Sequence, residues 1–206
     1  RFVVRGTDST AYVAVAFHAP AVGDADYLAC QVLTTVLGGA DGMSMSSGVL
    51  PNRSSRLYRA LVDAGLATDV SCSMPATIDP YLYEILAVVR DGVDPAAVEA
   101  AILDEIDRLR RDGLPETELA RAKKQARAEF AYSSERVTDQ GYWLGFAETV
   151  ADLSWYVDYL DRLESVSVED VVAAAGRHLD ERRRTVGHYL PGPGAVCAGD
   201  DDREDE

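Results

Sequence analysis

The stretch "NRSSRLYRALVDAGLATDVS" (Asn52–Ser71) predicts a capped helix, a glycine stop and a strand. Ser54 or Ser55 can cap the helix, because a serine side chain accepts a hydrogen bond from a free backbone N–H in the first turn. Gly65 stands where a left-handed residue commonly ends a helix. The apolar face of the helix consists of Leu57, Leu61 and Val62.

The segments on either side of this helix differ in character. Residues 66–74 alternate in polarity and predict a half-buried strand, one face of which carries Leu66, Thr68, Val70, Cys72 and Met74. Residues 38–53 are rich in Gly, Ser and Met and predict a loop that is longer than most connections in a compact domain. Loops of that length are more often functional or mobile than merely connecting.

Hydrophobic periodicity and capping residues place the remaining elements. Asp94 and Pro95 start a helix that Gly113 ends, and Ser167 forms a capping box with Asp170. Strands are predicted within residues 2–4, 10–20, 81–89 and 183–191, and helices within 24–39, 94–113, 114–135, 136–150, 154–164 and 167–179. Neighbouring strands joined by short turns favour an α+β fold, with a mostly antiparallel sheet and helices packed on one face.

The composition excludes some classes of partner. The 206 residues carry a net charge of −15, so we expect no nucleic acid or anionic membrane as a partner, because both need clustered Lys and Arg. No apolar run approaches the roughly 20 residues of a membrane-spanning helix. Cys30, Cys72 and Cys197 lack metal-binding spacing, so they are predicted to be small buried thiols in a reducing, cytoplasmic compartment.

The sequence offers few groups for catalysis. His18, His178 and His188 lie far apart, whereas zinc needs three or four convergent ligands, so we expect neither a metal site nor catalytic residues in this chain. The GxSxG nucleophile elbow and the Walker phosphate loop are both absent from the sequence. Charged residues of the helix 94–113 are predicted to pair on a solvated face, namely Glu99, Asp104, Glu105, Asp107, Arg108, Arg110 and Arg111.

The segment "LGGADGMSMSSGVLPNRSSRLYRALVDAGLATDVS" resembles the second, non-zinc half of pitrilysin/insulinase-family zinc metallopeptidases of the processing-peptidase type. In that half a glycine-rich loop leads into a helix that opens Ser-Arg-Leu-Tyr, matched here by residues 55–58, and a Gly-Leu-Ala turn follows, matched by residues 65–67. A later helix motif of the family is matched by Glu118, Leu119, Ala122 and Lys123. The similarity covers residues 8–191.

The resemblance implies two homologous α+β halves that close around a peptide. The half with the His-x-x-Glu-His (HxxEH) motif would bind Zn²⁺, on the same polypeptide or a separate one, and this chain would be its non-catalytic, substrate-side partner, inactive alone. Residues 1–192 would form the half-domain and residues 193–206 an acidic, disordered tail. The alternative is a scaffold or assembly subunit with the peptidase fold and no proteolytic activity. An exposed half-interface would favour a homodimer of the isolated chain.

One feature of the family is missing here. Many second halves place an Arg and a Tyr near the scissile bond, and the register fixed by residues 65–67 puts Leu61 and Thr68 at those positions. Substrate contacts are therefore expected from the loop 38–53, as a lip of the peptide chamber, and from residues beside it; the alternative is a surface loop without a partner. The predicted substrate-binding residues are Gly38, Gly39, Gly42, Ser46, Ser47, Gly48, Arg56, Tyr58 and Thr68.

Overall fold

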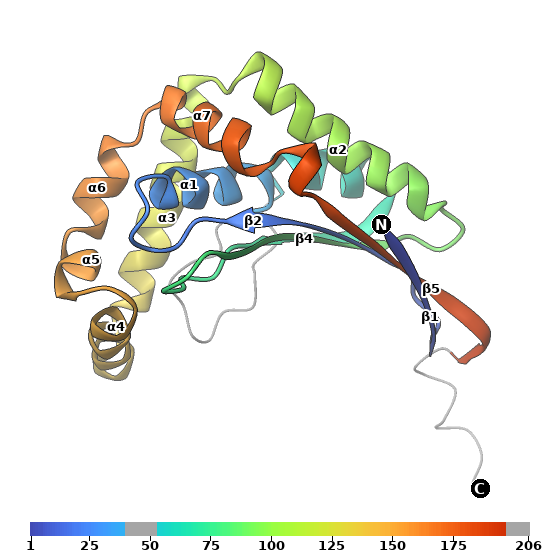
Figure 1. The fold of residues 1–206 in the computed structure, drawn as a ribbon, viewed down its shortest axis with the longest axis horizontal. Helices are drawn as coiled ribbons and strands as arrows, with labels where there is room; N and C mark the ends of the chain where they lie inside the picture. The colour runs from blue at the N-terminus through green and yellow to red at the C-terminus, as the bar shows by residue number, and fades with distance from the viewer. Residues whose placement is uncertain (40–52, 197–206) are drawn as a thin grey trace, which may run out of the picture.

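The computed structural model describes residues 1–39 and 53–196 and shows a five-stranded sheet with helices on one face (Figure 1). The strands are β1 (Phe2–Asp8), β2 (Tyr12–Ala19), β3 (Ala67–Ser73), β4 (Tyr81–Val89) and β5 (Thr185–Val196). The helices are α1 (Tyr27–Leu37), α2 (Pro95–Asp112), α3 (Glu116–Ser133), α4 (Val137–Val150), α5 (Leu153–Val157), α6 (Tyr159–Ser165) and α7 (Val168–His178), with a π-helix, η1 (Tyr58–Asp63), and a 3₁₀ turn, η2 (Glu181–Arg183). The predicted α+β class and one-sided helical layer are confirmed.

The strands follow the order β1-β5-β2-β4-β3 across the sheet. β2 pairs antiparallel with both β4 and β5, and β3 pairs antiparallel with β4, so the sheet is mostly antiparallel as predicted. Residues 2–4, predicted as a short partner of the strand that follows them, belong instead to a longer strand that pairs parallel with β5. The reason is that β5 lies between β1 and β2, so the two consecutive strands never become neighbours.

The core lies between the sheet and the helical layer. Val13, Val15 and Phe17 of β2 are buried toward the helices, whereas Ala14 and His18, which alternate with them along the strand, are exposed on the open face. Every residue of α1 except Gln31 is buried, so this helix runs through the middle of the layer. Burial of each such large apolar side chain contributes roughly 1.5–3 kcal/mol, so α1 supplies a large share of the apolar core.

Local capping signals match the structure closely. The side chain of Asp94 accepts a hydrogen bond from the Ala96 N–H at 2.9 Å, with Pro95 in the first helical position. Ser167 and Asp170 form the reciprocal capping box at the start of α7. These groups satisfy backbone N–H donors that have no partner inside the helix, which fixes where α2 and α7 begin.

Two boundaries differ from the prediction. Residues 154–164, predicted as one helix, form α5 and α6, which meet at Asp158, because this bend turns the aromatic residues of both helices toward the core. The last strand, predicted to end at Pro191, continues to Val196, because β1 supplies a partner there through the pair Asp8↔Val196. The start of the predicted tail is therefore part of the sheet, and residues 197–206 lie outside the described residues.

A partly exposed ion pair links the helices α1 and α7. Asp26, just before α1, accepts hydrogen bonds from Arg177 Nη2 at 2.6 Å and Arg177 Nε at 2.7 Å, and its carboxylate lies 2.9 Å from His178 Nε2. The hydrogen bonds from Arg177 lower the pKa of Asp26, although partial burial opposes them. The contact ties the start of α1 to the end of α7.

We expect Asp26→Asn to lower the free energy of unfolding by about 1 kcal/mol at neutral pH. Because the pKa of Asp26 is lower in the folded than in the unfolded chain, this stabilisation is complete above the unfolded value and is lost as the pH falls through the folded value. Urea unfolding at a series of pH values measures it, with Asp104→Asn as the control on an exposed face of α2. If the difference in the free energy of unfolding between wild type and Asp26→Asn grew on acidification, the ionised Asp26 carboxylate would not be the stabilising group.

Candidate substrate-side site at the root of the glycine/serine loop

The first end of the loop is fixed by Gly38 at the end of α1. The Gly38 N–H donates to the Thr34 carbonyl at 2.9 Å. A Cβ on Gly38 would lie 2.5 Å from Cys72 Sγ and 2.7 Å from the Cys72 backbone nitrogen, so only glycine lets α1 end against β3. Gly39 has a φ of 114°, a conformation that side chains rarely adopt. Both glycines are buried, and they position the start of the loop against an edge strand of the sheet.

The second end of the loop is fixed by the helical segment 56–63. Ser55 Oγ accepts a hydrogen bond from the Tyr58 N–H at 3.3 Å, so Ser55 is the residue that fills the predicted capping role. The segment was predicted as an α-helix, but residues 58–63 form the π-helix η1. The Leu66 N–H donates to the Leu61 carbonyl, five residues back, at 2.8 Å, which is the hydrogen-bond spacing of a π-helix. Gly65, with a φ of 77°, ends the segment as predicted.

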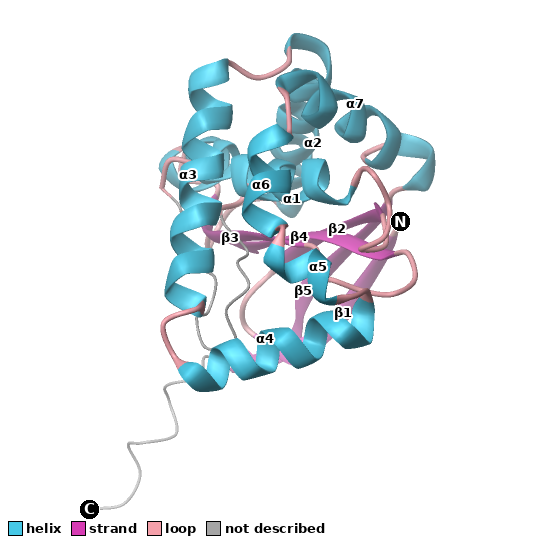
Figure 2. Cartoon of the chain, turned by 90° about the vertical axis from the view of Figure 1, so that its left-hand side faces the viewer, coloured by secondary structure: helices cyan, strands magenta, loops and turns pink. Residues whose placement is uncertain are grey.

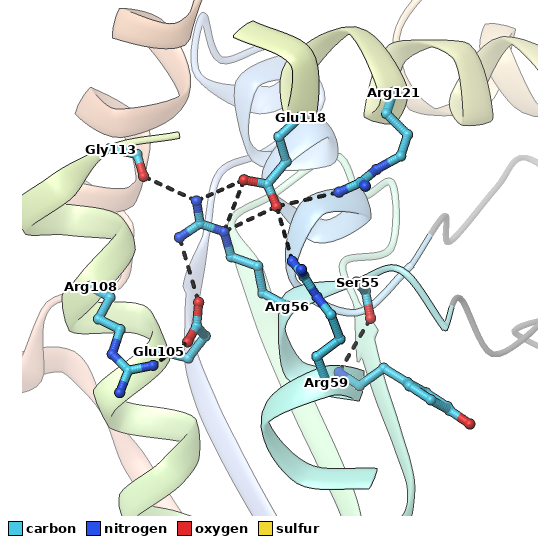
Figure 3. Close-up of polar contacts among 9 residues, drawn as sticks. Ser55, Arg56, Arg59, Glu105, Arg108, Gly113, Glu118 and Arg121 are labelled. Carbon is cyan, nitrogen blue, oxygen red and sulfur yellow. Dashed lines mark hydrogen bonds and ion pairs between the residues drawn. The ribbon is translucent and has the colours of Figure 1, made fainter. Parts of the chain in front are cut away.

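Arg56 joins this helical segment to α2 and α3 (Figure 3). Arg56 Nε donates to Glu118 Oε2 at 3.1 Å, and Nη2 donates to the same carboxylate at 2.7 Å and to the Gly113 carbonyl at 3.1 Å. Arg56 Nη1 lies 3.5 Å from Glu105 Oε1. The side chains of Arg56 and Glu118 are only 12% and 10% exposed, so this two-pronged pair is largely removed from water.

Exposed arginines surround this buried pair. Arg121 and Arg59 approach Glu118 Oε1 at 3.5 and 3.8 Å, and Arg108 approaches Glu105 Oε2 at 3.3 Å. Burial alone would lower the pKa of Arg56, but hydrogen bonds and charge from Glu118, with Glu105, outweigh it and raise the pKa above its ordinary value. Arg56 is therefore a permanent cation held at the junction of three helical segments.

The acidic residues of α2 correct the sequence prediction for that helix. Glu99 and Glu105, predicted to lie on a solvated face, are buried. Glu99 contacts His188 Nε2 at 2.8 Å and also Arg1, whereas Glu105 contacts Arg56. Glu105 follows Ile102 by three positions and precedes Leu109 by four, so its place on the apolar stripe was the available signal.

The predicted substrate-binding residues fall into two groups. Gly42, Ser46, Ser47 and Gly48 lie outside the described residues. The others, namely Gly38, Gly39, Arg56, Tyr58 and Thr68, lie at the two ends of the loop or on the neighbouring strand β3. Contact of these residues with a substrate stays a prediction.

Strand β3 does not follow the predicted alternation throughout. Its pairing with β4 shifts between Ala67 and Asp69, so Ala67 is buried and Thr68 is exposed, the reverse of the predicted faces. An extra residue in one strand breaks the two-residue period in this way. Thr68 Oγ1 donates to the Val88 carbonyl at 3.4 Å. Leu61, at the position where the resemblance expected an Arg, is fully buried in the core.

The described residues offer no metal site of the usual kind. Within residues 1–39 and 53–196, no group of three His, Cys, Asp or Glu side chains converges to hold a metal ion. His18 is exposed, while His178 and His188 bind to carboxylates.

Cys30 and Cys72 are buried as predicted, and burial raises the pKa of Cys30 to about 12. In the same part of the chain, helices long and apolar enough to span a membrane are not found.

We expect Arg56→Met to lower the free energy of unfolding by about 3 kcal/mol, because it removes the buried cation and leaves Glu118 and Glu105 only exposed arginines as partners. Arg121→Ala, which removes an exposed cation from the same carboxylate, should cost less than about 1 kcal/mol. The double variant Arg56→Met/Glu118→Met should recover part of the loss, as measured by urea unfolding. If Arg56→Met were as stable as Arg121→Ala, the buried pair would not hold the junction.

We expect Gly38→Ala to destabilise the chain by about 1–3 kcal/mol, because the added methyl group would overlap Cys72 of β3. Gly23→Ala is the matched control, since open space surrounds a Cβ at that position. Thermal unfolding of both variants provides the comparison. Equal melting temperatures would show that α1 does not end in close contact with β3.

Comparison with known proteins defines the family. The model described as the peptidase M16 inactive domain matches residues 1–126. The fold is similar to a protease from Helicobacter pylori, with a TM-score of 0.81 and 22% identity, over 93% of this chain and 44% of that chain. It is also similar to the inactive peptidase domain of a candidate zinc protease from Bordetella parapertussis, with a TM-score of 0.76 and 25% identity, over 92% of this chain and 97% of that one.

A more distant likeness concerns the fold alone. A chain in the complex III dimer from Candida albicans matches with a TM-score of 0.68 and 16% identity, over 93% of this chain and 45% of that chain. Among curated proteins, none matches the sequence significantly. The family match covers more than half of the chain, and the sequence features of the loop and its helix agree with it. The chain therefore belongs to the peptidase M16 family, as an inactive domain of the insulinase type, the second, non-zinc half.

Proposed function

We propose that this chain is the non-catalytic, substrate-side half of a zinc-dependent endopeptidase and closes a peptide chamber against a half that carries HxxEH. The observation that carries the proposal is the match to the M16 inactive domain, together with a Bordetella inactive peptidase domain of almost the same extent. The chain spans less than half of the Helicobacter pylori protease, which leaves room there for a second domain of similar size.

The two fixed ends of the loop, at Gly38 and at Arg56, are called its roots, and they support a role in substrate contact. Gly38 fixes one end of the loop against β3, and Arg56 fixes the other end against α2 and α3. A segment with two rigid ends can present its backbone to a peptide with a smaller entropic cost than a free loop. Residues 40–52, with Tyr58 and Thr68 beside them, would then contribute the wall of the chamber.

Chemistry would belong to the partner half. There Zn²⁺ would activate water and polarise the scissile carbonyl, with the glutamate of HxxEH as general base. This chain would supply substrate contacts and closure and would be inactive alone. A scaffold subunit with the same fold is the second candidate, and the fold of the complex III chain is the observation that favours it.

We expect the purified chain to bind no stoichiometric zinc, and a stable complex with the HxxEH-bearing half of the same organism to contain one zinc ion per pair. Metal analysis of size-exclusion fractions measures both values. A partner variant with both histidines of HxxEH replaced by alanine is the control, and its complex should be zinc-free. Tight, stoichiometric zinc in the isolated chain would overturn the assignment, and a partner without HxxEH would favour the scaffold.

We expect replacement of residues 40–52 by a short Gly/Ser turn to weaken peptide binding by the assembled enzyme, which would appear as a raised KM. The kcat of a peptide that still binds should change less, since the zinc site lies in the other half. Unchanged peptide affinity would show that the loop is only a surface connection. Thermal unfolding of the variant checks that the two roots remain folded.

A further inference from the structure

A cavity of about 420 Å³ lies between α1, the β3–β4 connection and the helices α4, α5 and α6. Figures 1 and 2 show α4 and α5 at one end of the sheet. Five of the lining residues are aromatic, namely Tyr27, Trp143, Phe146, Trp155 and Tyr159. This is an aromatic cavity, and it lies outside the loop roots described above.

The rings of the aromatic cavity pack against one another and form a stable wall. The ring centroids of Trp143 and Phe146 lie 5.5 Å apart in an edge-to-face arrangement, and those of Tyr27 and Trp155 lie 6.2 Å apart. Trp155 and Tyr27 are only 4% and 2% exposed, so they form the floor. Pro75 and Glu84, which also line the cavity, are exposed and mark its mouth.

Among the residues that the structure describes, Glu84 is the single charged one that lines the aromatic cavity. It lies on β4, opposite Ser73 of β3, and within the described part of the chain no ion pair or hydrogen bond involves its carboxylate. Burial raises the pKa of Tyr159 to about 12, so this phenol remains neutral at the floor. The cavity thus combines an aromatic wall with one carboxylate at its mouth that has no partner among the described residues.

We propose that the aromatic cavity binds the side chain of a lysine or arginine residue in a peptide. The aliphatic stem of such a side chain would pack on the rings, and the cationic group would bind Glu84 and the negative faces of the aromatic rings. A purely apolar side chain would cover Glu84 without giving the carboxylate a partner, which costs free energy. A side chain that is apolar along its length and cationic at its end matches both parts of the cavity.

The position of the aromatic cavity links it to the proposed function, on which this inference rests. Cys72 of β3 supports Gly38 at the loop root, and the next two residues, Ser73 and Met74, line the cavity. Gln31 Nε2 donates to Tyr27 Oη at 2.9 Å and to the Met74 carbonyl at 3.3 Å, so α1 holds the same wall. A peptide that touched the loop root could therefore place a nearby side chain in the cavity.

The chain reports occupancy of this cavity directly, because its only two tryptophans both line it. The probes are two capped pentapeptides, acetyl-Ala-Ala-Lys-Ala-Ala-amide and the same peptide with norleucine in place of lysine. Norleucine keeps the aliphatic stem and removes the charge. We expect the lysine peptide to shift the tryptophan emission and to bind about tenfold more tightly than the norleucine peptide.

Glu84→Gln should remove this preference, while Glu148→Gln should keep it, because Glu148 is exposed on α4 and does not line the cavity. Both substitutions change the net charge equally and both sites are exposed, so the fold should tolerate them. Equal binding of the two peptides, loss of the preference in Glu148→Gln, or no emission change with either peptide would each overturn the proposal. The experiment needs no catalytic half, so its result is independent of whether the assembled pair cleaves peptides.

Discussion

The two-pronged ion pair between Arg56 and Glu118 is the contact on which the candidate site depends. It is largely shielded from water, and burial of two charges is favourable only when nearly all of their hydrogen-bonding groups find partners. Arg56 meets this condition, because it also donates to the Gly113 carbonyl and lies beside Glu105. One side chain therefore fixes the helix that follows the loop, the end of α2 and the start of α3 with respect to one another.

Because the helices cover only one face of the sheet, the features that could contact a peptide lie along one edge of the domain. Helix α1 is buried along almost its whole length, so it packs inside the helical layer behind the sheet. Strand β3 is an edge strand, and it supports the first loop root at Cys72 and the wall of the aromatic cavity at Ser73 and Met74. Two features that could contact a peptide thus share one strand, which is the arrangement expected of a domain that contributes a wall rather than reactive groups.

The sequence predicts those parts of the fold that depend on neighbouring residues. The helix starts at Asp94 and Ser167 and the left-handed Gly65 follow from hydrogen bonds or backbone preferences within a few residues, and the structure confirms them. The Arg56–Glu118 pair joins residues 62 positions apart, so no local pattern indicates it. The shift at Thr68 depends on the pairing of β3 with β4, and the aromatic cavity depends on segments from α1 to α6; both arise only when distant segments pack together.

If the proposed function holds, this chain completes a peptidase whose chemistry lies in another half. The most direct test is to titrate the HxxEH-bearing half with this chain and to follow the cleavage of a fluorogenic peptide. We expect little cleavage by either half alone and a rate that rises to saturation at one chain per catalytic half. A catalytic half that cleaves equally well without this chain, or a pair that forms a complex without cleaving any peptide, would contradict it.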